Sequence, residues 1–397
     1  MGMISVMRRE LRYIFSNKRL LLILFVVPLL YTTMFGYLYS ANLVNGIKTV
    51  IVDQDKTPLS RTVVEAFNKS VKFDLVATLQ SEEDVEKYIK EGRAEAALIV
   101  PSDFTTNIYK GESCPLLIIV NGSNMIISNS VTTSSLQIIQ TLSTGIAAKK
   151  IQTAGGMDFD SAVSVVNPLS FRIRTWYNPA YNYSYFLILG LLATIIQQIT
   201  LLYVAVCMTR EKEHGTLDEL RQIKGSAFAK VLGKIFPYVL SSLITFTVSL
   251  LIIRFVFSIP IRGSVAAIFF VVIAFLFCIV SLGVLLSLIC KNEVEAIQYA
   301  MLVAVPSFLF SGFTWPLQAM PKLCKLLAAV LPLTYFSNAL RDVAIMGLDL
   351  SGVSSHLTAL VVLSLIFFPL AVIAYKFKYE RGADAKMINK KIEGDVS

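Results

Sequence analysis

The sequence predicts a membrane all-α protein of six transmembrane helices, with an amphipathic N-terminal elbow helix and an α/β extracytoplasmic domain between spans 1 and 2. Of the 397 residues, 55% are hydrophobic and only 16% are charged, whereas soluble domains are about 25% charged. Six long stretches carry no charge. The segment between the first two alternates β-branched runs with helical patterns. A soluble enzyme is therefore excluded.

Residues 1–19 predict a cytoplasmic amphipathic elbow helix. Its expected apolar face comprises Met3, Ile4, Met7, Leu11, Ile14 and Phe15, and its expected polar face comprises Arg8, Arg9, Glu10 and Arg12. A basic amphipathic helix before a span is expected to lie along the cytoplasmic leaflet. It either orients the first span or acts as a lever that moves with a partner protein.

Each predicted span approaches or exceeds the roughly 20 apolar residues that a bilayer requires. The spans are Leu20–Tyr39, Tyr183–Met208, Ile235–Ile253, Gly263–Cys290, Ala296–Met320 and Leu357–Tyr375. Eighteen Lys and Arg residues flank them on the side of both termini, and only a few lie in the short segments on the other side. The basic residues of the long segment 40–180 do not count, because long translocated domains are exempt from the positive-inside rule. That rule then places both termini, including a tail of residues 377–397, in the cytoplasm.

The membrane domain of residues 181–376 contains an irregular region at residues 296–354. Pro306, Ser311-Gly312 and Pro316 interrupt the fifth apolar run, and Leu326–Leu340 forms a second one shortly afterwards. We expect a span that breaks near Ser311-Gly312, followed by short outer helices, because broken backbone at that depth must be surrounded by protein. An ordinary helix kinked by proline is the alternative.

Residues 40–180 predict the extracytoplasmic domain. Its four expected strands are Thr49–Val52, Phe73–Thr78, Ala96–Val100 and Leu116–Val120, and a long helix follows at about Ile126–Ala148. The segment contains no Gly-x-Ser-x-Gly and no clustered histidines, and the five cysteines of the chain have no CxxC spacing. No catalytic residue and no metal site are predicted, so the domain is interpreted as a scaffold or docking module.

The loop of residues 209–234 is the richest hydrophilic segment near the spans. Charges alternate from Arg210 to Glu213, and Gly215-Thr216 is a plausible N-cap for a short helix with Asp218 and Glu219 in its first turn. The loop either presents this helix to a cytosolic partner or is a solvated turn between two spans.

Several of these segments resemble the permease subunits of type-2 ATP-binding-cassette (ABC) exporters, including bacterial multidrug efflux permeases. The most specific are Glu213-His214-Gly215-Thr216 and Ser311-Gly312-Phe313-Thr314-Trp315-Pro316. The sequence departs from the family pattern at Asn121, where Asp is usual, and at Leu189-Gly190, where Pro-Gly is common.

The resemblance implies a division of labour. The chain has no Gly-x-x-x-x-Gly-Lys-Ser/Thr loop, so it is not an enzyme and binds no cofactor itself; ATP-Mg belongs on two copies of a separate cytosolic ABC ATPase subunit. A second permease chain would complete a homodimer or heterodimer in the bacterial inner membrane. Membrane lipid and a periplasmic adaptor are further expected partners, and nucleic acid is not. The implied ATPase-coupling residues are Glu211, Glu213, His214, Gly215, Thr216, Leu217, Glu219 and Leu220.

The implied substrate route runs between the paired permeases and suits lipophilic or amphipathic cargo. Its candidate lining and gate residues are Gln197, Gln198, Asn292, Glu293, Gln298, Phe310, Phe313 and Trp315. Glu293 could equally lie at a cytoplasmic interface, and the aromatic residues could serve only for packing. Two other function classes stay open at this point: an ion-coupled secondary transporter, and a secretion or envelope-structural protein acting through its external domain.

Overall fold

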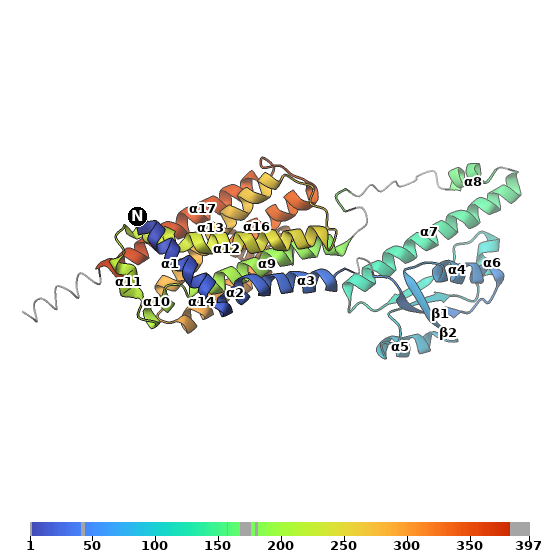
Figure 1. The fold of residues 1–397 in the computed structure, drawn as a ribbon. Helices are drawn as coiled ribbons and strands as arrows, with labels where there is room; N and C mark the ends of the chain where they lie inside the picture. Colours follow the sequence, from blue (N-terminus) through green and yellow to red (C-terminus); the bar gives the residue numbers. More distant parts are fainter. Residues whose placement is uncertain (1, 41–43, 157, 167–175, 179–181, 382–397) are drawn as a thin grey trace, which may run out of the picture. The chain divides into compact units, whose positions relative to one another are not determined.

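The computed structural model describes residues 2–40, 44–156, 158–166, 176–178 and 182–381. The chain divides into two compact units (Figure 1): a helical unit of residues 1–42 and 175–397, and an α/β unit of residues 43–174. Most of the predicted cytoplasmic tail lies outside the described residues.

The described part of the helical unit contains six helices that are long and apolar enough to cross a membrane. The first joins α2 (Lys18–Leu21), the π-helical turn η1 (Leu22–Val26) and α3 (Val27–Leu38). The others are α9 (Tyr183–Ala205) continuing into α10 (Thr209–Glu213), α12 (Ala227–Phe255), α13 (Val265–Ile289), α14 (Glu293–Phe310), and α17 (Ser354–Tyr375) with the π-helical turn η4 (Lys376–Arg381). The six predicted spans are thus confirmed as apolar helices, with shifted ends.

Shorter helices complete the unit: α1 (Gly2–Ser16), α11 (Leu217–Gln222), η2 (Leu317–Ala319), α15 (Lys322–Ala329), α16 (Pro332–Arg341) and η3 (Asp342–Met346). α15 and the α16–η3 helix are long and apolar enough to cross a membrane only when they are taken together, and they are bent by 85° relative to each other. They are the short helices expected after the fifth span.

The core of the helical unit forms around α13, which packs on α9, α12, α16 and α17. Helices in a bilayer associate through close packing and hydrogen bonds rather than through a hydrophobic driving force. Accordingly, a Cβ atom on Gly283 would lie only 2.9 Å from the Cβ of Val204 on α9. The ring of Phe275 stacks on Phe336 of α16 with their centroids 3.9 Å apart.

The fifth span breaks where the sequence predicts. α14 ends at Phe310, and Gly312 follows with φ +80. The carbonyl oxygens at a helix end lack partners within the helix, and α16 supplies one: the side-chain amide of Asn338 donates to the carbonyl oxygen of Ser311 at 3.1 Å. The helix therefore ends ten residues before the predicted Met320. It also continues through Pro306, which the sequence analysis wrongly treated as an interruption.

The α/β unit contains one four-stranded sheet with the order β2-β1-β3-β4. Its strands are β1 (Ile47–Asp53), β2 (Phe73–Leu79), β3 (Ala96–Val100) and β4 (Leu117–Val120). β1 pairs in parallel with β2 and β3, and β4 is antiparallel to β3. The helices are α4 (Pro58–Asn68), α5 (Glu82–Lys90), α6 (Phe104–Lys110), α7 (Met125–Gly155) and α8 (Phe159–Val166). The sheet thus contains the four strands that the sequence predicts; β3 has the predicted ends, and the other three have extended or shifted ends. The location of this unit outside the cytoplasm stays a prediction.

Candidate functional site

The first element of the site is α1, which packs along α12 (Figure 1). Its buried row is Val6, Glu10 and Ile14, spaced four residues apart on one helical face. The approach is close, since a Cβ atom on Gly233 of α12 would lie 2.8 Å from the carbonyl oxygen of Met3. The prediction that Glu10 shares the polar face with the arginines is therefore wrong.

Glu10 is buried because three groups from distant parts of the chain bind its carboxylate. Lys234 Nζ donates to Oε2 at 2.7 Å, and Arg210 Nη2 donates to Oε1 at 2.8 Å. The hydroxyl of Tyr238 also donates to Oε1. Burial alone would raise the pKa of Glu10, but the positive charges of Lys234 and Arg210 outweigh it and lower that pKa below the ordinary value.

Glu211, on α10, forms the second half of the same arrangement. Lys234 Nζ donates to its Oε1 at 2.6 Å, so one ammonium group bridges the two carboxylates. Arg9 Nη2 of α1 donates to Oε2 at 2.6 Å, and the hydroxyl of Thr216 donates to the same oxygen. We refer to Arg9, Glu10, Arg210, Glu211 and Lys234 as the ion-pair cluster.

The ion-pair cluster lies in the interior of the helical unit. Glu10, Lys234, Glu211 and Arg210 are 1%, 1%, 2% and 7% exposed. Their two negative and two positive charges balance, and only Arg9 extends to the surface with 27% of its side chain exposed. Buried charges are tolerated only when each keeps its partners. The cluster therefore fixes α1, α10 and α12 in one arrangement.

The loop of residues 209–234, which we call the coupling loop, contains α10 and α11, and residues 214–216 connect these two helices. Gly215 has φ +69, a backbone conformation that glycine adopts at no steric cost. Thr216 takes the N-cap position of α11, but its side chain bonds Glu211 instead of capping the helix. The loop is thus attached to the cluster through Thr216 as well as through Glu211.

The eight residues predicted for ATPase coupling divide into three groups by burial. Glu211 and Leu220 are 2% and 0% exposed, so neither can contact a partner chain in this arrangement. Glu213, His214, Gly215 and Glu219 are exposed, and Thr216 and Leu217 are half-buried. A cleft of about 400 Å³ separates the loop from α1. It is lined by Arg9, Glu10, Arg12, Tyr13, Ser16, Arg210, Glu211, His214, Thr216 and Glu219.

Two residues predicted for the substrate route lie beside the coupling loop. Glu213 Oε1 accepts a hydrogen bond from the backbone amide of Glu293 at 2.9 Å. Asn292 caps α14, accepting from the amide of Glu295 at 2.8 Å. The structure thus gives Asn292 a helix-capping role and favours the interface alternative for Glu293.

The other residues predicted for the route differ in burial. Gln197 is fully buried, and neither polar atom of its side chain has a partner among the described residues. Gln198 and Phe310 are half-buried, and Gln298 is exposed.

The two remaining gate candidates also differ from each other. Phe313 is buried and stacks on Phe186 with their centroids 5.1 Å apart, whereas Trp315 is 58% exposed. The ring of Phe313 lies against Gly190, where a Cβ atom would approach to 2.0 Å. The role of these residues as a route stays a prediction.

Sequence reasoning missed five members of the site: Arg9, Glu10, Arg210, Lys234 and Tyr238. The available signal was a single acid, Glu10, placed four residues from both Val6 and Ile14 in an otherwise basic helix. A second signal was Lys234, which adjoins a long apolar run. Buried charges need partners of opposite sign, so the two observations together could have suggested a pair.

Comparison with known proteins assigns the chain to a family. A family model described as ABC-2 family transporter protein matches residues 18–373. The chain belongs to this family. This ABC-2 permease is 23% identical over 360 residues to the probable multidrug ABC transporter permease YbhR of Escherichia coli (strain K12). The matched region covers 91% of this chain and 94% of that protein.

Two further relatives extend the comparison. The probable multidrug ABC transporter permease YbhS of the same strain is 26% identical over 352 residues, covering 85% of this chain and 87% of that protein. ABC transporter G family member 20 of Dictyostelium discoideum is 32% identical over 204 residues, covering 51% of this chain and 28% of that protein. The resemblance stated from the sequence is therefore confirmed, and the chain is a multi-pass membrane permease of an ABC transporter.

Proposed function

We propose that this ABC-2 permease exports lipophilic or amphipathic compounds from the cytoplasm or the inner leaflet, driven by ATP hydrolysis on a separate ABC ATPase subunit. The observation that carries the proposal is the ion-pair cluster, which joins the exposed coupling loop to both α1 and α12. Family membership supports an ATPase partner and a second permease chain.

The loop would transmit movement through Glu211. Its exposed residues, Glu213, His214, Gly215 and Glu219, would contact the ATPase. Because Glu211 shares Lys234 with Glu10, a displaced loop must carry α12 and α1 with it or leave a buried charge without a partner. ATP-driven closure of the ATPase pair would then favour one arrangement of the spans over another.

The partners follow from this assignment. ATP-Mg would be bound by two ATPase copies, since this chain contains no phosphate-binding loop of the Gly-x-x-x-x-Gly-Lys type. A second permease, identical or different, would complete the route, and both termini would lie in the cytoplasm of a bacterium. A periplasmic adaptor would engage the α/β unit.

The cargo class rests on the apolar spans and on the word multidrug in the names of YbhR and YbhS. Gln197 supports a route near α9, because a buried amide without hydrogen bonds is costly and would gain partners when a hydrated route opens beside it. We do not propose the two other function classes, the ion-coupled transporter and the structural protein, because the chain belongs to the ABC-2 family.

The proposal is tested in proteoliposomes that contain the purified permease with or without its ATPase. We expect ATP-dependent movement of the lipophilic dye Hoechst 33342 only when both subunits and Mg²⁺ are present. Uphill dye movement by the permease alone in a proton gradient would overturn the proposal, as would failure of the permease to bind any ABC ATPase.

A further inference from the structure

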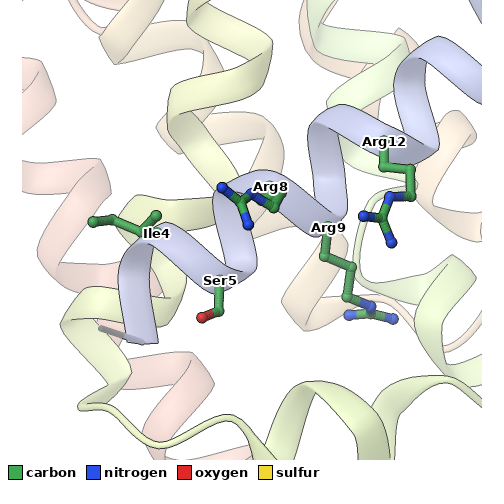
Figure 2. A pocket seen from close by; sticks show the side chains of 5 residues that line it. All are labelled: Ile4, Ser5, Arg8, Arg9 and Arg12. Carbon is green, nitrogen blue, oxygen red and sulfur yellow. The ribbon is translucent and has the colours of Figure 1, made fainter.

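The surface of α1 that faces away from α12 carries a row of arginines. Arg8 and Arg12 are exposed, and Arg9 lies between them. With Ile4 and Ser5 they line a hollow of about 390 Å³ (Figure 2). In the figure the side chains of Arg9 and Arg12 project to the same side of the helix. Three like charges are thus held along two turns of a single helix.

The described protein neutralises the charge of this hollow only at Arg9. Neither Arg8 nor Arg12 forms an ion pair with any described carboxylate. Arg9 Nη2 pairs with Glu211 at 2.6 Å and with Glu219 at 3.5 Å, whereas its Nη1 is buried and has no hydrogen-bond partner among the described residues. The remaining four charges of the ion-pair cluster balance one another. A guanidinium with an unused donor beside two unpaired arginines fits an anion that accepts several hydrogen bonds, as a phosphate does.

An apolar edge adjoins the arginines. Ile4 and Phe15 are 56% and 58% exposed, and both lie beside Arg8 on the helical wheel. The first span starts at Lys18, directly after α1. A helix with exposed arginines, an exposed apolar edge and an immediately following span fits the headgroup region of a bilayer. The same edge would contact acyl chains, which a free anion lacks.

We propose that Arg8, Arg9 and Arg12 form a binding site for the phosphate of an acidic phospholipid, with Ile4 and Phe15 against its acyl chains. Arg9 belongs to both this site and the ion-pair cluster. The bound headgroup therefore contacts Arg9, the residue next to Glu10 in the sequence, and helps to hold α1 against the coupling loop. The site does not depend on the transported compound or on the ATPase.

The test uses the full-length permease in nanodiscs of phosphatidylcholine with a minor fraction of phosphatidylglycerol. Native mass spectrometry counts the phosphatidylglycerol retained per chain. We expect enrichment of phosphatidylglycerol by the native protein, and a loss of roughly fivefold in lipid affinity for each arginine removed in Arg8→Gln/Arg12→Gln. Arg8→Lys/Arg12→Lys should keep most of the enrichment, because it keeps the charge.

The matched control is Lys322→Gln/Lys325→Gln, which removes two exposed charges from α15. It should retain phosphatidylglycerol like the native protein. Equal retention in the arginine and control variants would overturn the proposal. Displacement of the lipid by millimolar inorganic phosphate would also overturn it and would indicate a free-anion site. So would unchanged lipid retention with lost ATPase binding in Arg8→Gln/Arg12→Gln, which would indicate an acidic protein surface as the occupant.

Discussion

The two ends of α14 bury polar groups in different ways. At its start the neighbouring coupling loop is attached to the ion-pair cluster, in which four buried charges satisfy one another. At its end the broken backbone is satisfied by neutral donors, chiefly Asn338, which binds the carbonyl oxygen of Ser311. Losing a partner costs much more in the first case than in the second. The region at the start of α14 is therefore suited to transmit force rigidly, and the region at its end is suited to rearrange.

The largest effect is expected from Lys234→Met, because it leaves Glu10 and Glu211 without their shared cation. Loss of one partner from a buried pair costs about 3–5 kcal/mol. Thermal unfolding of the detergent-solubilised permease should show a strongly lowered midpoint, while Lys224→Gln on the exposed part of the same loop should not. A double variant with Glu10→Gln should be destabilised by less than the sum of the two single changes. Simple additivity would contradict a shared cluster.

An intermediate effect is expected from Asn338→Ala. Its side-chain amide donates to the carbonyl oxygens of Ser311 at 3.1 Å and Thr334 at 2.6 Å. An unsatisfied buried acceptor costs about 1–3 kcal/mol. We expect a smaller fall in the unfolding midpoint than for Lys234→Met, together with a changed fluorescence of Trp315, which follows Ser311 by four residues in the sequence. A fall as large as that of Lys234→Met would remove the distinction between the two ends.

Much of this fold could be predicted because its causes are local. A long apolar run suffices for a spanning helix, and Ser311-Gly312 suffices for a break. The helix ends were less predictable. α12 begins at Ala227, eight residues before the predicted Ile235, because buried partners allow Lys234 to lie inside the helix.

The ion-pair cluster could not be predicted in the same way, because its members lie about 200 residues apart. Glu10 and Arg210 are separated by 200 positions, and Glu10 and Lys234 by 224. An acid between arginines in an amphipathic helix looks solvent-exposed until its distant partners are known. The exposed part of the coupling loop, in contrast, could be recognised from its local charge pattern.

A smaller effect on stability is expected from Gly215→Ala. No atom lies within 4 Å of the added Cβ position, so only the left-handed backbone is penalised, by roughly 1–2 kcal/mol. Gly92→Ala is a matched control, since Gly92 has φ +68 and equally open space in the α/β unit. Both variants should unfold at similar temperatures, but only Gly215→Ala should lower dye transport per ATP hydrolysed. Equal transport in both would contradict a coupling role for the loop.

The smallest effect is expected from pH. The folded pKa of Glu10 is lowered below its ordinary value, so its ionised form contributes stability that is present above about pH 4.5 and lost as pH falls through the folded pKa. The difference in unfolding midpoint between the native protein and Glu10→Gln should therefore be constant near neutral pH and shrink below pH 4.5. A difference that does not change with pH would mean that Glu10 is not ionised in the cluster.

The coupling ratio of Glu211→Gln tests the central claim most directly, with Glu82→Gln, at an exposed glutamate of α5 in the α/β unit, as the control. Dye transported and ATP hydrolysed are measured together in proteoliposomes containing the permease and its ATPase. Because Glu211 links the loop to Lys234 and Arg9, Glu211→Gln should keep ATP hydrolysis and lose most transport. Glu82→Gln should keep both, because Glu82 lies outside the coupling loop and the ion-pair cluster. Normal transport per ATP in Glu211→Gln would show that force does not pass through the ion-pair cluster.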